Sequence, residues 1–330
     1  MNRITFRSAT ADDFEFFFRL HRESLGPYVD QVWGWEDEVQ RAYLRRTIDI
    51  ASTQVIVVDD VDVGRLTLGH RDDDIYLGLI EITPSHQGRG IGGRIVRSVL
   101  DAAFADAKGV RLHVLAVNAG AHRLYRRLGF ADVSREGIAP EIRIEMRAHP
   151  VTTPGPSAEV RFATHPWGLR SGTADDRGFI IEMARHASVI EDWPLPDAES
   201  EGVDSLMPSS DDVVIVATNV LGRPVGAAWT LHSDPPLMLD AAGASVPELC
   251  IAVAPGARGR GVGGVLLEEL ARVCASHHVA LCLNVHQRNG AARKLYVRNG
   301  FEDAGQGRGT LGIAMSKKLC RSVVADVGQT

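Results

Sequence analysis

Residues 79 to 93 read Leu-Ile-Glu-Ile-Thr-Pro-Ser-His-Gln-Gly-Arg-Gly-Ile-Gly-Gly, and this stretch decides the fold. A short apolar run ends at Pro84, a glycine-rich loop follows, and residues 94 to 100 have the apolar pattern of a helix. Glycine lets the backbone turn sharply and come close to a ligand. Because the first N–H groups of a helix have no partner inside it, they can bind a phosphate group. The stretch therefore predicts a phosphate-bearing ligand.

The stretch occurs a second time. Residues 250 to 264 read Cys-Ile-Ala-Val-Ala-Pro-Gly-Ala-Arg-Gly-Arg-Gly-Val-Gly-Gly, which places Arg258 opposite Gln87 at an offset of 171 (258 − 87). Further on, Asn118 begins a segment that ends Leu-Tyr-Arg-Arg-Leu-Gly-Phe, and Asn289 begins its counterpart at the same offset (289 − 118). Solenoid repeats run roughly 20–50 residues, so a repeat of this length indicates one duplicated domain.

The length of 330 residues allows two domains, each large enough to bury its own core. Residues 151–158 contain prolines, a glycine and small polar residues without apolar periodicity, which is typical of a linker. We therefore expect an N-terminal domain at 1–150, a C-terminal domain at 159–320 and a flexible tail at 321–330.

Composition excludes several classes of protein. A net charge of −6 gives no sign of nucleic-acid binding, and the sequence contains neither a run long enough to span a membrane nor a signal peptide. The four cysteines lack zinc-like spacing, so we expect reduced thiols, no metal and a cytoplasmic protein.

Local patterns predict the elements around the two glycine-rich loops. We expect residues 28–35 to be too irregular for a plain helix, with their two tryptophans in the core or, alternatively, in a pocket wall. Three acidic residues, Asp72 to Asp74, suggest a solvated hairpin tip. The other expectations are a strand over 74–82, a helix ending near Lys108 with Gly109 as its cap, a strand over 110–117, a strand over 161–164, a helix over 175–186, a surface loop over 191–210 and a helix over 262–277.

The combined pattern of strand, Pro, Gly-x-Gly-x-Gly loop, helix, strand, Asn and Leu-Tyr-x-x-x-Gly-Phe resembles the GNAT superfamily of acetyl-coenzyme-A-dependent N-acyltransferases, in both halves and over nearly the whole chain. The resemblance implies an α/β (α+β) fold with two GNAT-like domains. Each would contain a mixed, largely antiparallel central sheet flanked by helices and splayed between its fourth and fifth strands. By analogy with dimeric relatives, the protein would be a monomer with an internal pseudo-dimer, with a homodimer as the alternative.

The resemblance also implies which residues bind acetyl-CoA. The backbone amides of Ile82 and Val253 would meet the thioester carbonyl, and Asn118 and Asn289 would lie along the pantetheine arm. The loop residues that would hold the pyrophosphate are Gln87, Gly88, Arg89, Gly90, Gly92 and Gly93 in the first half, and Arg258, Gly259, Arg260, Gly261, Gly263 and Gly264 in the second. Tyr125 and Tyr296 would be the general acids.

The chemistry of amine acetylation adds a general base. A primary amine of pKa near ~10.4 is mostly protonated at pH 7, so a carboxylate, acting directly or through water, is useful. Glu81 is the candidate in the first half, with an outward-facing strand residue as the equal alternative. The corresponding residue is Ala252, so we choose Glu248 for the second half. His113 and His86 are weaker substitutes.

Other interpretations stay open. Both loops also satisfy the Gly-x-Gly-x-x-Gly dinucleotide fingerprint, but residues 110–117 and 279–286 lack the acidic residue that a Rossmann fold requires. The preferred function is acetyl transfer to a primary amine by direct attack in a ternary complex, with a small molecule or a peptide as acceptor. The alternatives are a pseudo-dimer with one catalytic and one structural or sensing half, and another acyl-CoA reaction such as decarboxylation or longer acyl transfer.

Overall fold

In a computed structural model of the chain, residues 3–71, 73–150, 166–189 and 194–319 are described. Contacts divide the chain into two units, Met1–Gly168 with Asn219–Arg223 and Leu169–Thr218 with Pro224–Thr330. The linker expected at 151–158, the strand expected at 161–164 and the tail expected at 321–330 lie outside the described residues.

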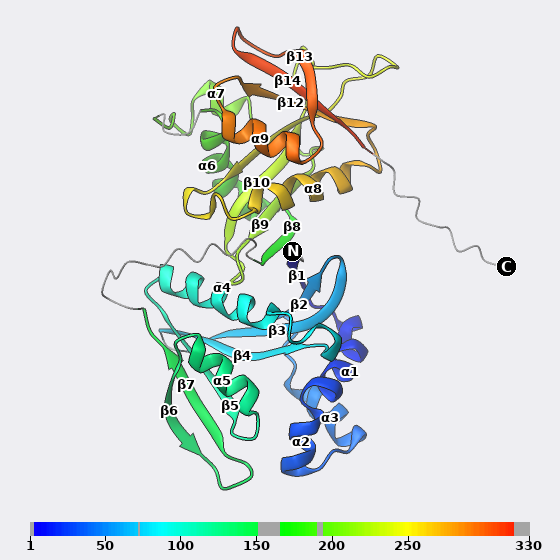
Figure 1. The fold of residues 1–330 in the computed structure, drawn as a ribbon. Helices are drawn as coiled ribbons and strands as arrows, with labels where there is room; N and C mark the ends of the chain where they lie inside the picture. The colour runs from blue at the N-terminus through cyan, green and yellow to red at the C-terminus, as the bar shows by residue number, and fades with distance from the viewer. Residues whose placement is uncertain (1–2, 72, 151–165, 190–193, 320–330) are drawn as a thin grey trace, which may run out of the picture. The chain divides into compact units, whose positions relative to one another are not determined.

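The first unit is built on strands in the order β1-β2-β3-β4-β5-β7-β6 (Figure 1). All neighbouring pairs are antiparallel except β4 and β5. The strands are β1 (Ile4–Ser8), β2 (Thr53–Val58), β3 (Val61–Arg71), β4 (Asp74–Ile82), β5 (Gly109–Leu115), β6 (Ala131–Glu136) and β7 (Arg143–Ala148), and the helices are α1 (Phe14–Ser24), α2 (Gly26–Trp33), α3 (Asp37–Thr47), α4 (Ile91–Ala105) and α5 (Ala119–Arg127).

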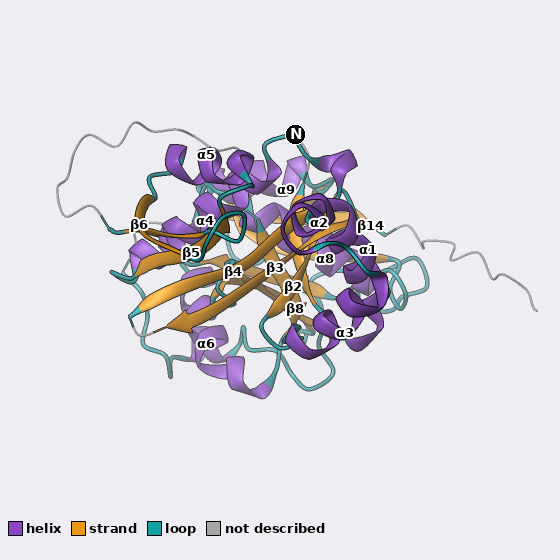
Figure 2. Cartoon of the chain, turned by 90° about the horizontal axis from the view of Figure 1, so that it is seen from below, coloured by secondary structure: helices purple, strands orange, loops and turns teal. Residues whose placement is uncertain are grey.

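Helices cover both faces of this sheet (Figure 2). Strand residues alternate between faces, so Ile56 of β2 packs with Ile95 and Val99 of α4, while Val55 packs with Phe17 of α1 and Leu44 of α3. Thr10 and Asp13 form a capping box just before α1, which fixes where that helix starts. The two cores bury opposite faces of the same strands.

An extra residue in β4 changes which side chains face α1. Thr67 pairs with Leu79 and Leu68 with Leu77, so Gly78 has no partner in β3 and forms a bulge. Before the bulge Leu77 joins the core beneath α4, and after it Ile80 does. If Gly78 were a regular strand residue and not a bulge, the strict two-residue alternation would put Leu77 and Glu81 on one face. The bulge therefore turns Glu81 toward α1.

The second unit repeats the strand order as β8-β9-β10-β11-β12-β14-β13. In its core, Ile180 and Met183 of α6 pack with Cys250 of β11. The strands are β8 (Trp167–Ser171), β9 (Val214–Thr218), β10 (Pro224–Leu231), β11 (Glu248–Val253), β12 (Ala280–His286), β13 (Glu302–Gln306) and β14 (Gly312–Lys318), and the helices are α6 (Arg177–Ala187), α7 (Glu201–Asp204), α8 (Val262–Cys274) and α9 (Gly290–Arg298).

Both sheets splay between the strand before the glycine loop and its parallel neighbour, as predicted. In the first unit the pairing of β4 with β5 ends at Leu77 and Leu112, although β4 continues to Ile82. In the second unit, β11 and β12 pair at Glu248 and Cys282. Each sheet thus opens toward its glycine loop.

Several local predictions were wrong. Residues 26–33 form the regular helix α2, since Pro27 fits the first turn of a helix. Helix α4 ends at Ala105, and Gly109 begins β5 instead of capping the helix. Asp74 is buried and pairs with Arg147 at 2.7 Å, so it is not part of a solvated tip. Within 191–210, residues 201–204 form α7, and its Val203 is fully buried.

Candidate functional site

The two glycine-rich loops have the same backbone conformation. Gly88 and Gly90 have φ of 72° and 76°, and Gly259 and Gly261 have φ of 71° and 90°. A Cβ atom added at any of these four positions would meet no protein atom within 4 Å. The left-handed backbone therefore requires glycine, and the space above each loop is open. Gly90 and Gly261 are the N-caps of α4 and α8, so the helix amides face that open space.

The first residue of each loop braces the loop against the preceding strand. Nε2 of Gln87 donates to the carbonyl of Ile82 at 2.8 Å, and Nε of Arg258 donates to the carbonyl of Val253 at 3.0 Å. Both side chains thus act on the protein backbone at the end of the strand. Arg89 and Arg260 are exposed beside the glycines, where their charge can favour an anion.

The glycines inside the helices differ between the units. A Cβ atom at Gly263 would lie 2.8 Å from the end of the Leu295 side chain of α9, so that side chain would have to shift to admit one. At the equivalent Gly92 the nearest atom, in Ile82, would be 3.4 Å away, and at Gly93 the nearest, in Leu124, would be 3.7 Å away, which are ordinary contacts. Gly92 and Gly264 lie in the first turns of α4 and α8 and add N–H groups to the open side.

Asn118 and Asn289 have an observed structural role. The Asn118 side-chain oxygen accepts from the Ala121 amide at 3.0 Å, and Asn289 caps α9 in the same way at 3.1 Å from Ala292. Asn118 therefore fixes the start of the helix that carries Tyr125, and Asn289 fixes the start of the helix that carries Tyr296. The contact with a pantetheine arm that the resemblance implies would then come from the side-chain NH₂ group of each asparagine.

Tyr125 and Tyr296 occupy equivalent buried positions, each 8% exposed. The Tyr125 ring packs edge-on against Phe130 at 5.7 Å, and Tyr296 against Phe301 at 5.9 Å. Burial raises the pKa of Tyr125 to about 12 and also raises the pKa of Tyr296. Both phenols are therefore protonated at neutral pH and could donate a proton.

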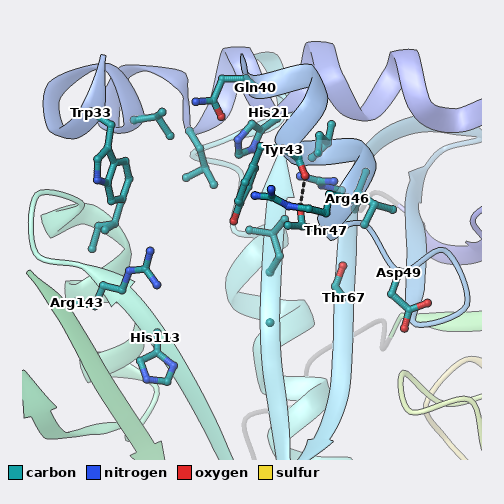
Figure 3. Close-up of a pocket in the computed structure, with 18 of the residues that line it drawn as sticks. His21, Trp33, Gln40, Tyr43, Arg46, Thr47, Asp49, Thr67, His113 and Arg143 are labelled. Atoms are coloured by element: carbon teal, nitrogen blue, oxygen red, sulfur yellow. Dashed lines mark hydrogen bonds between the residues drawn. The ribbon is translucent and has the colours of Figure 1, made fainter. Parts of the chain in front are cut away.

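A cavity of about 860 Å³ lies in the first unit between α1–α3 and the splayed strands (Figure 3). Trp33 and Tyr43 line it from α2 and α3, and Leu79 and His113 line it from β4 and β5. Trp33 is 46% exposed, whereas Trp35 packs against Phe18 in the core, so each tryptophan follows one of the two alternatives. The volume suits a small molecule or the end of a peptide.

Glu81 lies in a buried cluster behind this cavity. Its carboxylate, which has no exposed side-chain surface, forms an ion pair with Arg65, contacts Nδ1 of His21 at 2.8 Å and accepts from Ser24 Oγ at 3.1 Å. Burial alone would raise the pKa of Glu81, but the charge of Arg65 and the hydrogen bond with His21 outweigh it and lower the pKa. Glu81 is thus a buried anion and not an outward-facing strand residue.

His21 is the site residue that the sequence analysis missed. It lines the cavity, and its ring is held by Glu81 through Nδ1, which leaves Nε2 as its second functional nitrogen. In sequence it is one polar residue on the buried face of a phenylalanine-rich helix, where a histidine commonly has a structural role. The feature that marks His21 as a site residue is its contact with the buried carboxylate of Glu81, sixty positions later. The helical period around His21 does not by itself predict this contact.

Three alanines replace this cluster in the second unit. The capping boxes at Thr10 and Thr173 give an offset of 163 (173 − 10), which places Ala184 at the position of His21. The cross-strand pair Arg65 and Glu81 corresponds to the pair Ala227 and Ala252. The exposures of these alanines are 0%, 0% and 8% in chain order, so their places are buried as well.

The space over these alanines is filled with apolar side chains. Trp229 stands opposite Cys250, as Thr67 of the cavity stands opposite Leu79. Its indole is fully buried, packs with Met183 and Val203, and donates from Nε1 to the Leu206 carbonyl at 2.7 Å. The face that carries a cavity in the first unit thus carries packed core here.

Glu248, the candidate base of the second unit, lies at the start of β11. Since the pairing of β10 with β11 has no bulge, Glu248 shares a face with Cys250 and Ala252. The residue is 7% exposed. Its carboxylate pairs with Arg308 and accepts from Ser233 Oγ at 3.2 Å. It lies five residues before Val253, whereas Glu81 directly precedes Ile82.

The remaining candidates separate. His113 lines the cavity with Tyr76, whose hydroxyl lies 3.3 Å from its Nδ1, whereas His86 contacts Thr83 and Ser85 beside the glycine loop. Across the part of the chain that is described, no group of three His, Cys, Asp or Glu side chains could hold a metal ion. In the same residues, no helix has the length and apolar character needed to cross a bilayer.

Sequence comparisons match both units. The profile described as "Acetyltransferase (GNAT) family" matches residues 14–130, and "Acetyltransferase (GNAT) domain" matches residues 210–303. Over 234 residues the chain is 29% identical to a mycothiol acetyltransferase from Thermobispora bispora, covering 68% of this chain and 72% of that protein. A mycothiol acetyltransferase from Tsukamurella paurometabola is 28% identical over 233 residues, covering 67% and 73%.

Comparison of structures gives matches that cover part of this chain. One is the PaiA N-acetyltransferase of Thermoplasma acidophilum in complex with coenzyme A, at 15% identity and a TM-score of 0.37, covering 44% of this chain and 98% of that one. Another is a GCN5-related N-acetyltransferase from Kribbella flavida, at 23% identity and a TM-score of 0.37, covering 46% and 98%.

Proposed function

The chain belongs to the GNAT family of acetyl-CoA-dependent acetyltransferases and carries two of its domains, and from this premise we propose that the first unit acetylates a primary amine by direct attack in a ternary complex. The observation that carries this proposal is the geometry of β4. That strand ends at the open glycine loop. Its face toward α1 and the gap between it and β5 border the 860 Å³ cavity. One strand would thus connect the acetyl donor with the acceptor.

The chain's own residues would bind and orient the donor. The bound acetyl-CoA supplies an activated thioester. The amides of Gln87 through Gly93 would hold its pyrophosphate at the start of α4, where the helix dipole favours negative charge. The Ile82 amide would lie against the thioester carbonyl and stabilise the developing oxyanion. Tyr125, whose phenol is protonated at neutral pH, would donate a proton to the leaving sulfur.

We assign the general base to His21, with Glu81 as the positioning residue. Glu81 has no exposed side-chain surface, so an amine in the cavity reaches it only through another group. His21 lines the cavity and contacts Glu81, so Nε2 would accept the proton of the ammonium group. The anionic carboxylate fixes the ring and stabilises the imidazolium that forms.

The second unit would bind acyl-CoA without acetylating an amine. Its glycine loop has the same open conformation, but alanines stand at the three positions of the His21, Arg65 and Glu81 cluster. Glu248 and Tyr296 support the competing candidate, in which the second unit is catalytic. The two candidates make opposite predictions for variants of the two loops.

The test compares Gly90→Asp with Gly261→Asp. At both positions an Asp would combine backbone strain with negative charge where the pyrophosphate binds. Calorimetry should find two acetyl-CoA sites in the native chain and one in each variant. Gly90→Asp should lower amine acetylation, followed by thiol release and product mass, by more than about 100-fold, and Gly261→Asp by less than about twofold.

The two variants serve as controls for each other. If Gly261→Asp abolishes turnover and Gly90→Asp does not, the second unit is the catalytic one. If each variant halves the activity, both units catalyse and the division of labour is wrong.

A further inference from the structure

Two arginines stand on different walls of the cavity. Arg143 begins β7 beside Trp33 of α2, with its guanidinium carbon 5.9 Å from the indole centroid. Arg46 lines the cavity from α3, near Tyr43 and Thr47. Figure 3 shows Arg143 with Trp33 and His113 on one side, and Arg46 with Tyr43 on the other. The cavity therefore has positive charge on two sides.

Little negative charge balances these arginines. Among the lining residues, the one carboxylate is Asp49, whose Oδ1 accepts from the Ala51 amide. Within the described residues, neither Arg143 nor Arg46 forms an ion pair with a carboxylate, although Glu136 stands opposite Arg143 in the strand register. The third lining arginine, Arg65, is neutralised by Glu81. An ammonium ion that entered alone would meet net repulsion.

The exposed surfaces of the walls are flat and aromatic. Trp33 is 46% exposed and Tyr43 47%, and both line the cavity. Large aromatic side chains at such exposure offer stacking surface for a ring, with the indole N–H and phenol hydroxyl as polar groups. Gly312 occupies the position of Arg143 in the second unit, because Leu115 pairs with Arg143 as His286 pairs with Gly312. The charged wall is therefore specific to the first unit.

We propose that the amine acceptor of the first unit also carries an acid group, a carboxylate or a phosphate, which binds Arg143, and a ring that packs against Trp33. This inference rests on the proposed function and names its acceptor class. The guanidinium provides two parallel N–H donors that match either acid group, and the acid group offsets the charge of the cavity. The amine of the same molecule then faces His21. Arg46 provides the second cationic contact.

The test uses acceptor pairs that differ in the acid group alone. Suitable pairs are 4-(aminomethyl)benzoate with 4-(aminomethyl)benzamide, and glucosamine 6-phosphate with glucosamine. We expect kcat/KM to be at least about tenfold higher for the acid member of one or more pairs, and the pair concerned distinguishes carboxylate from phosphate. Arg143→Gln should reduce this ratio to near one. Arg45→Gln, on α3 but outside the cavity lining, should preserve it.

Calorimetric binding of the same pairs in the presence of coenzyme A separates this inference from the proposed function. If acid members bind about tenfold tighter through Arg143 but no amine is acetylated, the subsite stands and the proposed function fails. If neutral members bind and react as well as acid members in every pair, or if Arg143→Gln leaves the preference intact, the inference is wrong.

Discussion

The two units share a scaffold and differ on one face of it. Strand order, capping box, glycine-loop φ angles and the buried Tyr–Phe pair recur in both. The face toward α1 carries a cavity and a buried ionic cluster, whereas the face toward α6 carries alanines and a buried tryptophan. The comparison indicates that the demands of holding coenzyme A and of holding an acceptor are separable within this fold.

The energetics favour a cluster that is either complete or absent. Removing one member of a buried ion pair leaves the other charge unpaired, at a cost of about 3–5 kcal/mol. Replacing both by well-packed apolar residues is often neutral or stabilising. Ala227 and Ala252, with Trp229 filling the adjacent space, are such a replacement. A unit that lacks one of these charges is therefore expected to lack its partner as well.

The largest expected difference between the two units is the effect of removing the proposed general base. His21→Gln retains a hydrogen-bond donor for Glu81 but cannot accept the amine proton, so we expect kcat to fall by about 10²–10³-fold. Glu248→Gln in the other unit should change kcat by less than about threefold. Steady-state rates, with thermal unfolding as a check on folding, measure both.

A second readout separates catalysis from structure at His21. Added imidazole should partly restore the activity of His21→Ala, because a small base can enter the vacated space. If imidazole has no effect and Glu248→Gln removes activity, the catalytic assignment of the two units must be exchanged.

A smaller effect concerns the two tyrosines. Tyr125→Phe removes the proton donor, so kcat should fall by about 10–100-fold while KM for acetyl-CoA changes little. Tyr296→Phe removes the same hydroxyl from an equally buried position and should leave kcat within about twofold. Unchanged turnover in a chain that carries both substitutions would remove the general-acid role from either tyrosine.

The smallest expected effect tests a feature that both units share, the ion pair between an arginine and the capping-box aspartate. Hydrogen bonds from Arg7 and Arg170 lower the pKa values of Asp13 and Asp176 to about 2, below the ordinary value of 3.8. Because the folded pKa is depressed, each pair stabilises the fold above about pH 4 and loses this contribution as pH falls toward 2. Asp13→Asn and Asp176→Asn should each cost about 1 kcal/mol at pH 7, since the arginines are partly exposed.

Calorimetric unfolding at pH 7 and at pH 3 checks this prediction. The cost of each substitution should be similar in the two units and smaller at the lower pH. A cost that grows on acidification would contradict the sign, and a large difference between the two variants would show that the shared frame is not equally stable in both halves.

The sequence predicted the repeated frame because local patterns carry it. The glycine loops need positive φ, and the Asn118 and Asn289 caps need short polar side chains, so these positions can be recognised in the sequence. The helices around the loops follow from the same motifs. The family resemblance then supplied the mixed, largely antiparallel sheet and its splay, which spacing alone does not give.

The acceptor side was less predictable because long-range packing determines it. Glu81 was predicted as a site residue, but its partners His21 and Arg65 lie 60 and 16 positions away and meet it through a bulge at Gly78 that the sequence analysis did not predict. Asp74 looked like one of three surface acids until Arg147 of β7 paired with it. Residues 28–35 looked irregular because the exposed side chain of Trp33 interrupts the apolar period of α2.

Gly78 separates the length of β4 from the positions of its side chains. Deletion of this one residue would place Leu77 directly before Leu79, so the strand would alternate regularly and the residues from Leu79 to Ile82 would keep their faces. The carboxylate of Glu81 would stay opposite Arg65 and beside His21. A chain one residue shorter in this strand can thus present the same acceptor-side charge, so a difference in length here is not in itself a difference in function.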